Sequence, residues 1–356
     1  MLRVAIVGGG QIAAGAHLPT FQQLPGEVEV VAVVDATTEL ARGFAERFGL
    51  PYHSDDLDAM LADVRPDLVT ISSPPALHAD QVARALRAGA WVWCEKPPCL
   101  SLAEYDAMVA AEREGGPYAA IVFQQRFGSA AQHARRLIAE GGLGAPYVAH
   151  CQTTWYRDPA YYAVPWRGKW ATEGGGPVMG LGIHQLDLLL ELLGPWREVR
   201  AMAARLAREV ETDDVTTALI RFESGALATV VNTCLAPRQV SHLRIDLADG
   251  TLELSHLYGY ANENWTFTPA PHAAKELWEP PAEDLPSTHL TQLRGLLADL
   301  RAGRRPRASG NDGRVSLELI TAMYRAALTG ETVEAGQIGP GDPFYTSLDG
   351  GLSDRL

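Results

Sequence analysis

Lysine and cysteine are both scarce in this sequence. Only three of the 30 basic residues are lysines, at positions 96, 169 and 275, and the others are arginines. The four cysteines form no CxxC pair, which argues against a zinc site and favours reduced thiols in a cytoplasmic protein. No apolar run reaches the ~20 residues that cross a bilayer, and the N-terminus lacks a secretory layout.

Positive charge is also in deficit. The formal net charge is −13, from 30 basic and 43 acidic residues. Nucleic acids and anionic membranes both require a basic surface, so neither is expected as a partner. The one arginine-rich run, at 301–307, suits the C-terminal turn of a helix. A length of 356 residues, 47% of them apolar, predicts one large or two medium globular domains.

Strand-like and helix-like segments alternate over the first third of the chain. The strand-like segments are short, rich in β-branched residues and without polar alternation, as in strands that are buried on both faces. Their alternation with helices predicts an α/β fold with a doubly wound parallel sheet. The expected strands are 3–8, 28–35, 67–73, 90–95 and 118–124, and the expected helices are 38–48, 78–88 and 102–114.

The first expected strand ends in a glycine-rich turn, "GGGQIA". Gly8, Gly10 and Ala13 fit the pattern G-x-G-x-x-A, in which small residues let a pyrophosphate approach the start of the next helix. Asp35 ends the second strand, 25 residues after Gly10, where a carboxylate can accept both ribose hydroxyls of NAD. No arginine follows Asp35 directly, so the sequence favours NAD over NADP.

Lys96 follows the apolar segment "WVWC" and precedes two prolines. Ligands of a doubly wound sheet bind beyond the carboxyl ends of the strands, so Lys96 is expected at the mouth of the cofactor crevice. The prolines restrict the backbone and stiffen the segment. The alternative is a surface lysine that pairs with Glu95.

These motifs resemble those of the Gfo/Idh/MocA oxidoreductases, a family named for glucose–fructose oxidoreductase, inositol dehydrogenase and a rhizopine-catabolism protein. The resemblance covers nearly the whole chain and rests on "VAIVGGGQIA", "AHLP", "ISSPPALHADQVARALRAGAWVWCEKP", "QRF", "GGGPVMGLGIHQLDLLLELLG" and "SGNDGRVSLELITAMYRAA". It implies an NAD-binding Rossmann domain at 1–123 and a substrate-binding and oligomerisation domain at 124–356. The second domain would contain a large, open, antiparallel-rich sheet, and a helix at about 315–328 would pack back on the first. Sugars, polyols and their oxidised forms are the implied substrates.

The motifs and the resemblance together indicate which residues bind the cofactor. The candidates are Gly8, Gly10, Gln11, Ile12, Asp35, Ser73, Pro74, His78, Glu95 and Lys96. His78 matches a family histidine near the crevice, although a structural role at the start of a helix is the favoured interpretation for it.

A second constellation lies at 171–194. Its apolar positions 183, 186, 190 and 193 fit one face of a helix, which Gly194 ends. His184, near the start of this helix, matches the family's catalytic histidine. An imidazole titrates near neutrality and can accept a hydroxyl proton, while the ammonium of Lys96 can stabilise the developing alkoxide.

Gly180 departs from the family pattern. The family motif is D-x-G-x-H-x-x-D, and its first Asp assists proton transfer; aligned on His184 and Asp187, that position is Gly180. Three interpretations stay open. The proton could pass to water or to a substrate group, dehydrogenase activity could be lost or repurposed, or another carboxylate could substitute. The candidates for such a carboxylate are Asp158, Glu173 and Asp187.

The segment 153–176 is dense in Trp, Tyr and Arg. Aromatic faces suit the C–H faces of sugar rings, while tyrosine hydroxyls and arginines suit the ring hydroxyls. Packing against the sheet or a partner subunit is the alternative. The candidate substrate contacts are Tyr156, Arg157 and Arg167 from this segment, with Arg126 at the link between domains and Asp187 as a hydroxyl acceptor.

The rest of the chain predicts an antiparallel sheet. One face would pack on helices; the other, if apolar, must meet another subunit, so a homodimer or homotetramer is expected. The strand-like segments are 198–207, 215–222, 226–234, 242–247 and 250–254.

The favoured function is that of an NAD-dependent dehydrogenase or reductase acting on a sugar, sugar derivative or cyclic polyol. Lys96 would be the electrostatic anchor and His184 the proton acceptor, with no metal. One alternative is an NAD-dependent lyase or glycoside-cleaving enzyme that works by transient ring oxidation and elimination. The other is a non-catalytic NAD-binding sensor.

Overall fold

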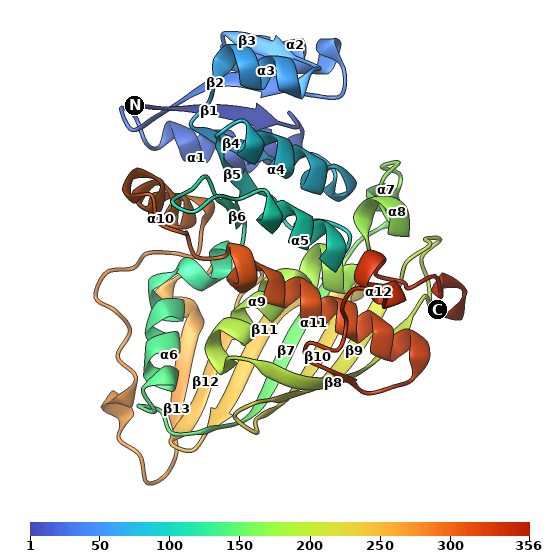
Figure 1. Cartoon of the computed structure of the whole chain (residues 1–356). Helices are drawn as coiled ribbons and strands as arrows, with labels where there is room; N and C mark the ends of the chain where they lie inside the picture. Colours follow the sequence, from blue (N-terminus) through green and yellow to red (C-terminus); the bar gives the residue numbers. More distant parts are fainter. The chain divides into compact units, whose positions relative to one another are not determined.

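A computed structural model describes residues 1–356, which divide into two compact units (Figure 1). The first unit holds Met1–Val122 and Gln292–Arg314, and the second holds Phe123–Thr291 and Val315–Leu356. None of the helices is both long enough and apolar enough to span a bilayer. The packing of the helix near 315–328 on the first domain stays a prediction.

The segment 292–314 belongs to the first unit because it pairs with strand β6 (Ala119–Ile121). The amide of Ile121 donates to the carbonyl of Ala308 at 2.8 Å, and its carbonyl accepts from the side chain of Gln292 at 2.6 Å. The predicted domain limits had placed this segment in the second domain. Such a return of the chain leaves no local trace in the sequence.

The first unit contains six parallel strands in the order β3-β2-β1-β4-β5-β6, which confirms the predicted doubly wound sheet. The strand order reverses at β1, between β1 and β4, and ligands of such sheets bind beyond the carboxyl ends of the strands at this point. The short edge strand β3 was not predicted. The strands are β1 (Leu2–Val7), β2 (Val28–Val34), β3 (Tyr52–Ser54), β4 (Leu68–Ile71), β5 (Trp91–Cys94) and β6.

The helices of the first unit begin at residues that satisfy their free N–H groups. The hydroxyl of Thr37 accepts from Leu40 at the start of α2 (Thr38–Phe48), which ends at Gly49 in the left-handed region with φ 70°. Ser101 caps α5 (Leu102–Ala110) in the same way. The remaining helices of this unit are η1 (Ala13–His17), α1 (Leu18–Gln22), α3 (Leu57–Val64), η2 (Pro75–Leu77), α4 (His78–Arg87) and most of α10 (His289–Ala302).

The second unit is built on an eight-stranded sheet, which confirms the predicted antiparallel-rich sheet. Its order is β13-β12-β11-β7-β10-β9-β8-β14, and only the central pair β7–β10 is parallel. Strand β7 and the edge strands β13 and β14 were not predicted. The strands are β7 (Pro146–Tyr156), β8 (Trp196–Ala204), β9 (Val215–Phe222), β10 (Leu227–Thr233), β11 (Leu235–Leu247), β12 (Gly250–Ser255), β13 (Trp265–Pro269) and β14 (Val333–Glu334).

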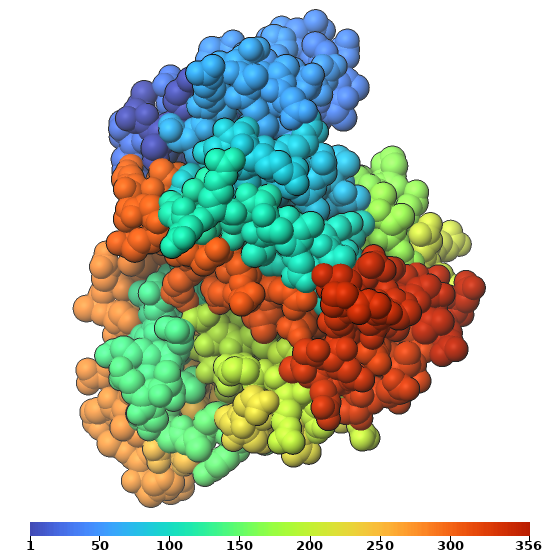
Figure 2. All heavy atoms as spheres, viewed as in Figure 1, coloured from blue at the N-terminus to red at the C-terminus, as the bar shows by residue number.

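Helix α9 (Ile183–Leu193) lies against the inner face of this sheet, where it contacts β7 and β11 (Figure 1). The sequence predicted one apolar face for α9, whereas nearly every residue of the helix is buried. The reason is that α6 and α11 pack on the helix as well. The C-terminal residues, dark red in Figure 2, lie on the surface of this unit. The other helices are η3 (Gln124–Phe127), α6 (Ser129–Ala139), α7 (Pro159–Tyr162), α8 (Trp170–Glu173), η4 (Val178–Gly182), η5 (Asn262–Asn264), η6 (Lys275–Leu277), α11 (Gly310–Thr329), α12 (Pro343–Thr346) and η7 (Ser353–Arg355).

Candidate functional site

The glycine turn after β1 is locked against the end of β4. Gly8 has φ +89°, and a Cβ on it would lie 2.6 Å from the backbone nitrogen of Ser73. The hydroxyl of Ser72 donates to the carbonyl of Gly8 at 2.8 Å. Only glycine fits at position 8, which is the property that the sequence pattern predicts.

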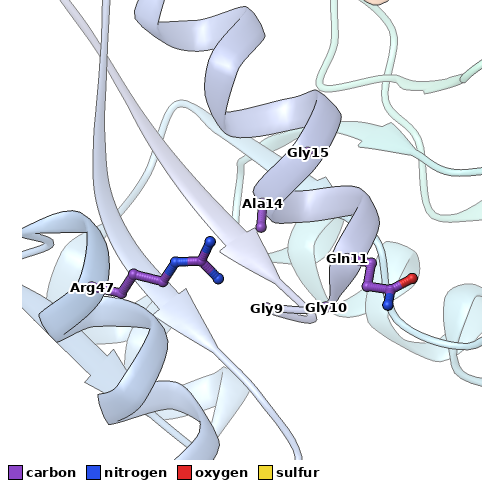
Figure 3. Close-up of a pocket in the computed structure, with 6 residues that line it drawn as sticks. All are labelled: Gly9, Gly10, Gln11, Ala14, Gly15 and Arg47. Carbon is purple, nitrogen blue, oxygen red and sulfur yellow. The ribbon is translucent and has the colours of Figure 1, made fainter.

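A cavity of about 500 Å³ opens beside this turn (Figure 3). A Cβ on Gly10 would meet nothing within 4 Å, and the helix that starts at Gln11 directs free N–H groups towards the space. Figure 3 shows the side chain of Arg47 reaching from α2 towards the turn. Arg47 was not among the predicted cofactor-binding residues. Amides at a helix start facing a guanidinium suit the pyrophosphate of a dinucleotide. The lining residues are Gly9, Gly10, Gln11, Ala14, Gly15 and Arg47.

Asp35 lies at the edge of the same turn. One carboxylate oxygen accepts from the amide of Gly9 at 2.8 Å, and the other accepts from the amide of Ala36 at 2.7 Å. A carboxylate offers about four acceptor positions, so ribose hydroxyls can still bind to it. The residues of the turn therefore fit a dinucleotide whose ribose is unphosphorylated.

Lys96 follows β5 and is partly exposed. Its neighbour Glu95 is buried and accepts from the ring of His17 at 2.8 Å and from the amide of Lys96 at 3.2 Å. The other ring nitrogen of His17 lies 2.8 Å from the hydroxyl of Thr70, and the ring packs edge-on against Trp93. This buried network fixes the backbone from which Lys96 extends. His17 belongs to the sequence segment "AHLP", and no functional role was predicted for it.

His78 connects the loops that follow β4 and β5. Its two ring nitrogens lie 2.8 Å from the carbonyl of Ser73 and 2.9 Å from that of Pro97. Burial lowers the pKa of His78, and the two carbonyls only partly oppose this effect. His78 therefore has the structural contacts that the sequence favoured, one residue from Lys96. The hydroxyl of Ser73 is itself bonded to Gln81.

His184 lies in the first turn of α9 and is only 4% exposed. Its ring packs edge-on against Tyr258, with centroids 5.7 Å apart, and Tyr258 packs in turn against Trp155 at 6.2 Å. Gln124 donates to the hydroxyl of Tyr258. Tyr258 follows β12, about 70 residues after His184, so no local pattern could connect the two.

The structure brings several of the predicted substrate residues together with aromatic rings. We name this group the aromatic–arginine cluster: Trp155, Arg157, Tyr161, Trp166 and Arg167. The guanidinium of Arg157 lies 4.9 Å from the ring centre of Trp155 and 5.1 Å from that of Tyr161, and Arg167 lies 3.8 Å from Tyr161 and 4.4 Å from Trp166. Burial raises the pKa of Tyr161, which keeps its hydroxyl neutral. Tyr156 lies beside the cluster, exposed, under the guanidinium of Arg208.

Arg126 and Asp187 are paired with each other. Both side chains are buried, and the guanidinium donates twice to the carboxylate, once at 2.8 Å. Ser316 also donates to Asp187, and Glu191 lies 3.2 Å from Arg126. These contacts occupy the polar atoms that the two residues would offer to a substrate. The role of Arg126 and Asp187 as substrate contacts stays a prediction.

The glycine-rich approach to α9 rests on a buried acid that the sequence analysis did not single out. Asp213 accepts from the amide of Gly176 at 3.0 Å, from the hydroxyl of Tyr324 at 2.8 Å and from the hydroxyl of Thr216. Burial raises the pKa of Asp213 to about 6, against the opposing effect of these donors. The network holds the turn that leads to His184.

Comparisons with known proteins agree with this arrangement. The oxidoreductase family with an NAD-binding Rossmann fold matches residues 2–122, and the GFO/IDH/MocA C-terminal domain matches residues 131–253. D-apiose dehydrogenase of Paraburkholderia graminis is 32% identical over 99% of this chain and 94% of that protein. D-glucoside 3-dehydrogenase of Escherichia coli is 29% identical over 94% of this chain and 97% of that protein.

Solved structures agree as well. The WlbA dehydrogenase of Bordetella pertussis, crystallised with NADH and UDP-GlcNAcA, has a TM-score of 0.81 and 28% identity, and the match covers 94% of this chain and 98% of that one. The matches span both units, and they confirm the resemblance drawn from the motifs. The chain belongs to the GFO/IDH/MocA family of oxidoreductases, and its first unit is an NAD-binding domain.

Proposed function

We propose that this protein is an NAD-dependent dehydrogenase or reductase that acts on a secondary alcohol of a sugar, a sugar derivative or a cyclic polyol. The observation that carries the proposal is the aromatic–arginine cluster, which contacts His184 through Trp155 and Tyr258. Aromatic faces and guanidinium groups together suit a ring with many hydroxyls. Both relatives named above are dehydrogenases of sugars or glycosides by name, which supports the same substrate class.

Lys96 and His184 carry the chemistry in this proposal. Bound NAD supplies the hydride acceptor. The ammonium of Lys96 stabilises the alkoxide that develops as the hydride leaves, and His184 takes the hydroxyl proton. The proposal requires that these two side chains meet over the nicotinamide when the substrate binds. The buried His17–Glu95 pair supports the proposed role of Lys96, because the pair fixes the backbone at that residue.

We also propose that NAD is preferred over NADP. The carboxylate of Asp35 lies beside the glycine turn, where it would repel a 2′-phosphate.

The family position that usually holds an assisting Asp is Gly180 in this chain.

A screen of sugars, sugar acids and inositols with NAD and with NADP, read at 340 nm, tests the function. We expect net NADH formation with at least one of these alcohols. Lys96→Met and His184→Gln should each lower kcat/KM by about 10²–10⁴-fold, and His184→Gln should leave NAD binding unchanged. The matched controls are Lys275→Met and His53→Gln, both at exposed positions, which should leave activity unchanged. Activity that survives both catalytic variants would refute the mechanism.

The comparisons give the lyase alternative no support, since both relatives named above are dehydrogenases. Cleavage of a glycoside without net NADH would be its signature in the same screen. The sensor alternative predicts NAD binding without turnover on any substrate. Membership of an oxidoreductase family favours the enzyme over the sensor.

We further propose a homodimer or homotetramer that forms through the outer face of the eight-stranded sheet, in a cytoplasmic protein. This face is mixed rather than apolar: Leu219 is 61% and Met202 76% exposed, whereas Arg221 and Glu198 form an ion pair at 2.7 Å. All four cysteines are buried and unbridged, which fits a reducing compartment. Light scattering after size-exclusion chromatography should show an oligomer that Leu219→Glu dissociates and the control Leu206→Glu, in the loop after β8, does not.

A further inference from the structure

The turn before His184 has a position without a side chain, and one buried carboxylate lies beside it. A Cβ on Gly180 would meet the Oε1 atom of Glu173 at 3.5 Å and no other atom within 4 Å. Glu173 ends α8, seven residues earlier in the chain. The family motif has a carboxylate at position 180, where this chain has glycine. The carboxylate of Glu173 therefore lies next to the space that the side chain of the family's aspartate would fill.

The position of Glu173 is well defined. Its side chain is 7% exposed, one oxygen accepts from the amide of Gly168 at 2.6 Å, and the other lies 3.3 Å from the guanidinium of Arg167. Arg167 is itself held between the rings of Tyr161 and Trp166. A carboxylate with such partners is held in one place, and it connects the aromatic–arginine cluster to the turn before α9.

Gly180 and His184 lie on the same side of their helix. They are four residues apart in the continuous helical stretch formed by η4 and α9, and residues at this spacing lie one above the other. A negative charge beside Gly180 is thus presented to the side of the helix that carries His184.

The other candidate carboxylates are committed elsewhere. Asp158 is exposed and caps α7 by accepting from the amide of Tyr161 at 2.9 Å. Asp187 is enclosed by Arg126 and Ser316. Of the three candidates from the sequence, only Glu173 reaches the space beside Gly180.

We propose that Glu173 is the positioning residue for His184, in place of the aspartate that the family motif has at position 180. In the oxidation direction the alcohol C–H bond releases a hydride to the nicotinamide and the O–H bond releases a proton to His184, which leaves a ketone. Glu173 exchanges no proton in this step. Its negative charge raises the basicity of His184 and stabilises the imidazolium that forms. The inference rests on the proposed function.

The first test is Glu173→Gln, which keeps the size and removes the charge. We expect kcat/KM to fall by about 100-fold, at the lower end of general acid–base effects, with NAD binding unchanged. The acidic limb of the pH profile should move to lower pH, because a neutral neighbour no longer favours protonated His184. If Glu173 had a purely structural role, Glu173→Gln would lower the melting temperature and leave this limb in place.

The second test restores the charge from the other side. Glu173→Gln combined with Gly180→Asp should regain at least about 10-fold in kcat/KM and return the limb towards its wild-type position, because the new carboxylate occupies the adjoining space. Gly180→Asp alone places two carboxylates next to each other and should bring no gain in kcat/KM. This single variant keeps the test valid if Glu173→Gln fails to fold.

Several charged and titratable groups lie around Glu173 and His184. They are Arg167, Tyr161, Tyr162 and Tyr324, with Asp213 behind Tyr324, while Tyr258 faces His184. Burial raises the pKa of Tyr161, Tyr162 and Tyr324, so these three remain neutral near pH 7. Arg167→Lys keeps the charge beside Glu173 and should leave the limb where it is.

Two results would overturn the inference while leaving the proposed function intact. One is a folded Glu173→Gln enzyme with wild-type activity and an unshifted limb. The other is a gain of 10-fold or more from Gly180→Asp alone, which would mean that the missing carboxylate is not supplied by Glu173. A wild-type protein that oxidises no alcohol would instead refute the proposed function.

Discussion

Asp187 accepts two hydrogen bonds from the guanidinium of Arg126 inside the second unit, where the two side chains are 0% and 1% exposed. Ser316, from α11, donates to the same carboxylate at 3.0 Å. The pair thus joins η3, α9 and α11. A buried pair of this kind contributes little net stability, but the loss of one partner leaves an uncompensated buried charge.

The first prediction follows from this pair. Asp187→Leu should lower the free energy of unfolding by about 3–5 kcal/mol, because Arg126 would lose its main counter-charge in a buried site. Arg126→Met combined with Asp187→Leu should recover most of that loss. Urea unfolding of the three proteins measures both effects. Glu46→Leu, in an exposed pair with Arg42, is the control and should change the free energy of unfolding by less than about 1 kcal/mol. An Asp187→Leu enzyme of normal stability with a raised KM would show instead that Asp187 binds the substrate.

The second prediction concerns the glycine turn. Gly8→Ala should destabilise the first unit by about 1–3 kcal/mol, because alanine resists a φ of +89° and its Cβ would overlap the backbone of Ser73. Affinity for NADH should fall as the turn distorts. Gly43→Ala is the matched control: it lies within α2 with nothing within 4 Å of its Cβ, and it should stabilise the protein slightly. Thermal unfolding and NADH fluorescence report the two quantities, and equal behaviour of the two variants would contradict the argument.

The features that the sequence predicted well are local ones, formed by residues that are close in the chain. Gly8 and Asp35 each follow a strand, and their role depends on the strand–turn–helix unit around them. Strand β7 was missed: no element was predicted at 146–152, and residues 153–156 were assigned only to the segment dense in Trp, Tyr and Arg. Its buried positions nevertheless alternate as in any half-buried strand. The segment 292–314 groups with the first unit, whereas the predicted domain limits placed it in the second. The sequence does not reveal this grouping, because the pairing of the segment with β6 spans more than 170 residues.

The parts of the site that could not be predicted are contacts between distant segments. His17 meets Glu95 across 78 residues, and Tyr258 meets His184 from a loop with no motif. Glu173 was one of three candidate carboxylates, and the sequence had no means of ranking them. The choice depends on which of them reaches the space beside Gly180, a property of the folded chain alone.

The third prediction concerns cofactor choice. Asp35→Ser keeps an acceptor for the amide of Gly9 and removes the charge that repels a 2′-phosphate, so the ratio of the Kd for NADPH to that for NADH should fall by at least about 10-fold. Arg47, across the cavity, would then attract the phosphate. Adding Arg47→Gln should reverse most of the gain. Fluorescence titration with both nucleotides measures the ratio, and an unchanged ratio after Arg47→Gln would show that the guanidinium does not reach the 2′-phosphate.

The fourth prediction uses the pKa of Asp213, which burial raises to about 6 from 3.8. The folded protein binds this proton more tightly than the unfolded chain, so the stability that protonated Asp213 provides is lost as the pH rises from about 4 to 6. A shift of about two pKa units corresponds to about 3 kcal/mol. Asp213→Asn stays neutral at every pH and can keep the bonds from Gly176 and Tyr324. The difference in unfolding free energy, wild type minus variant, should therefore fall by about 3 kcal/mol between pH 4 and pH 7. Urea unfolding at a series of pH values measures this difference, and parallel curves for the two proteins would mean that Asp213 is already charged in the fold at pH 4.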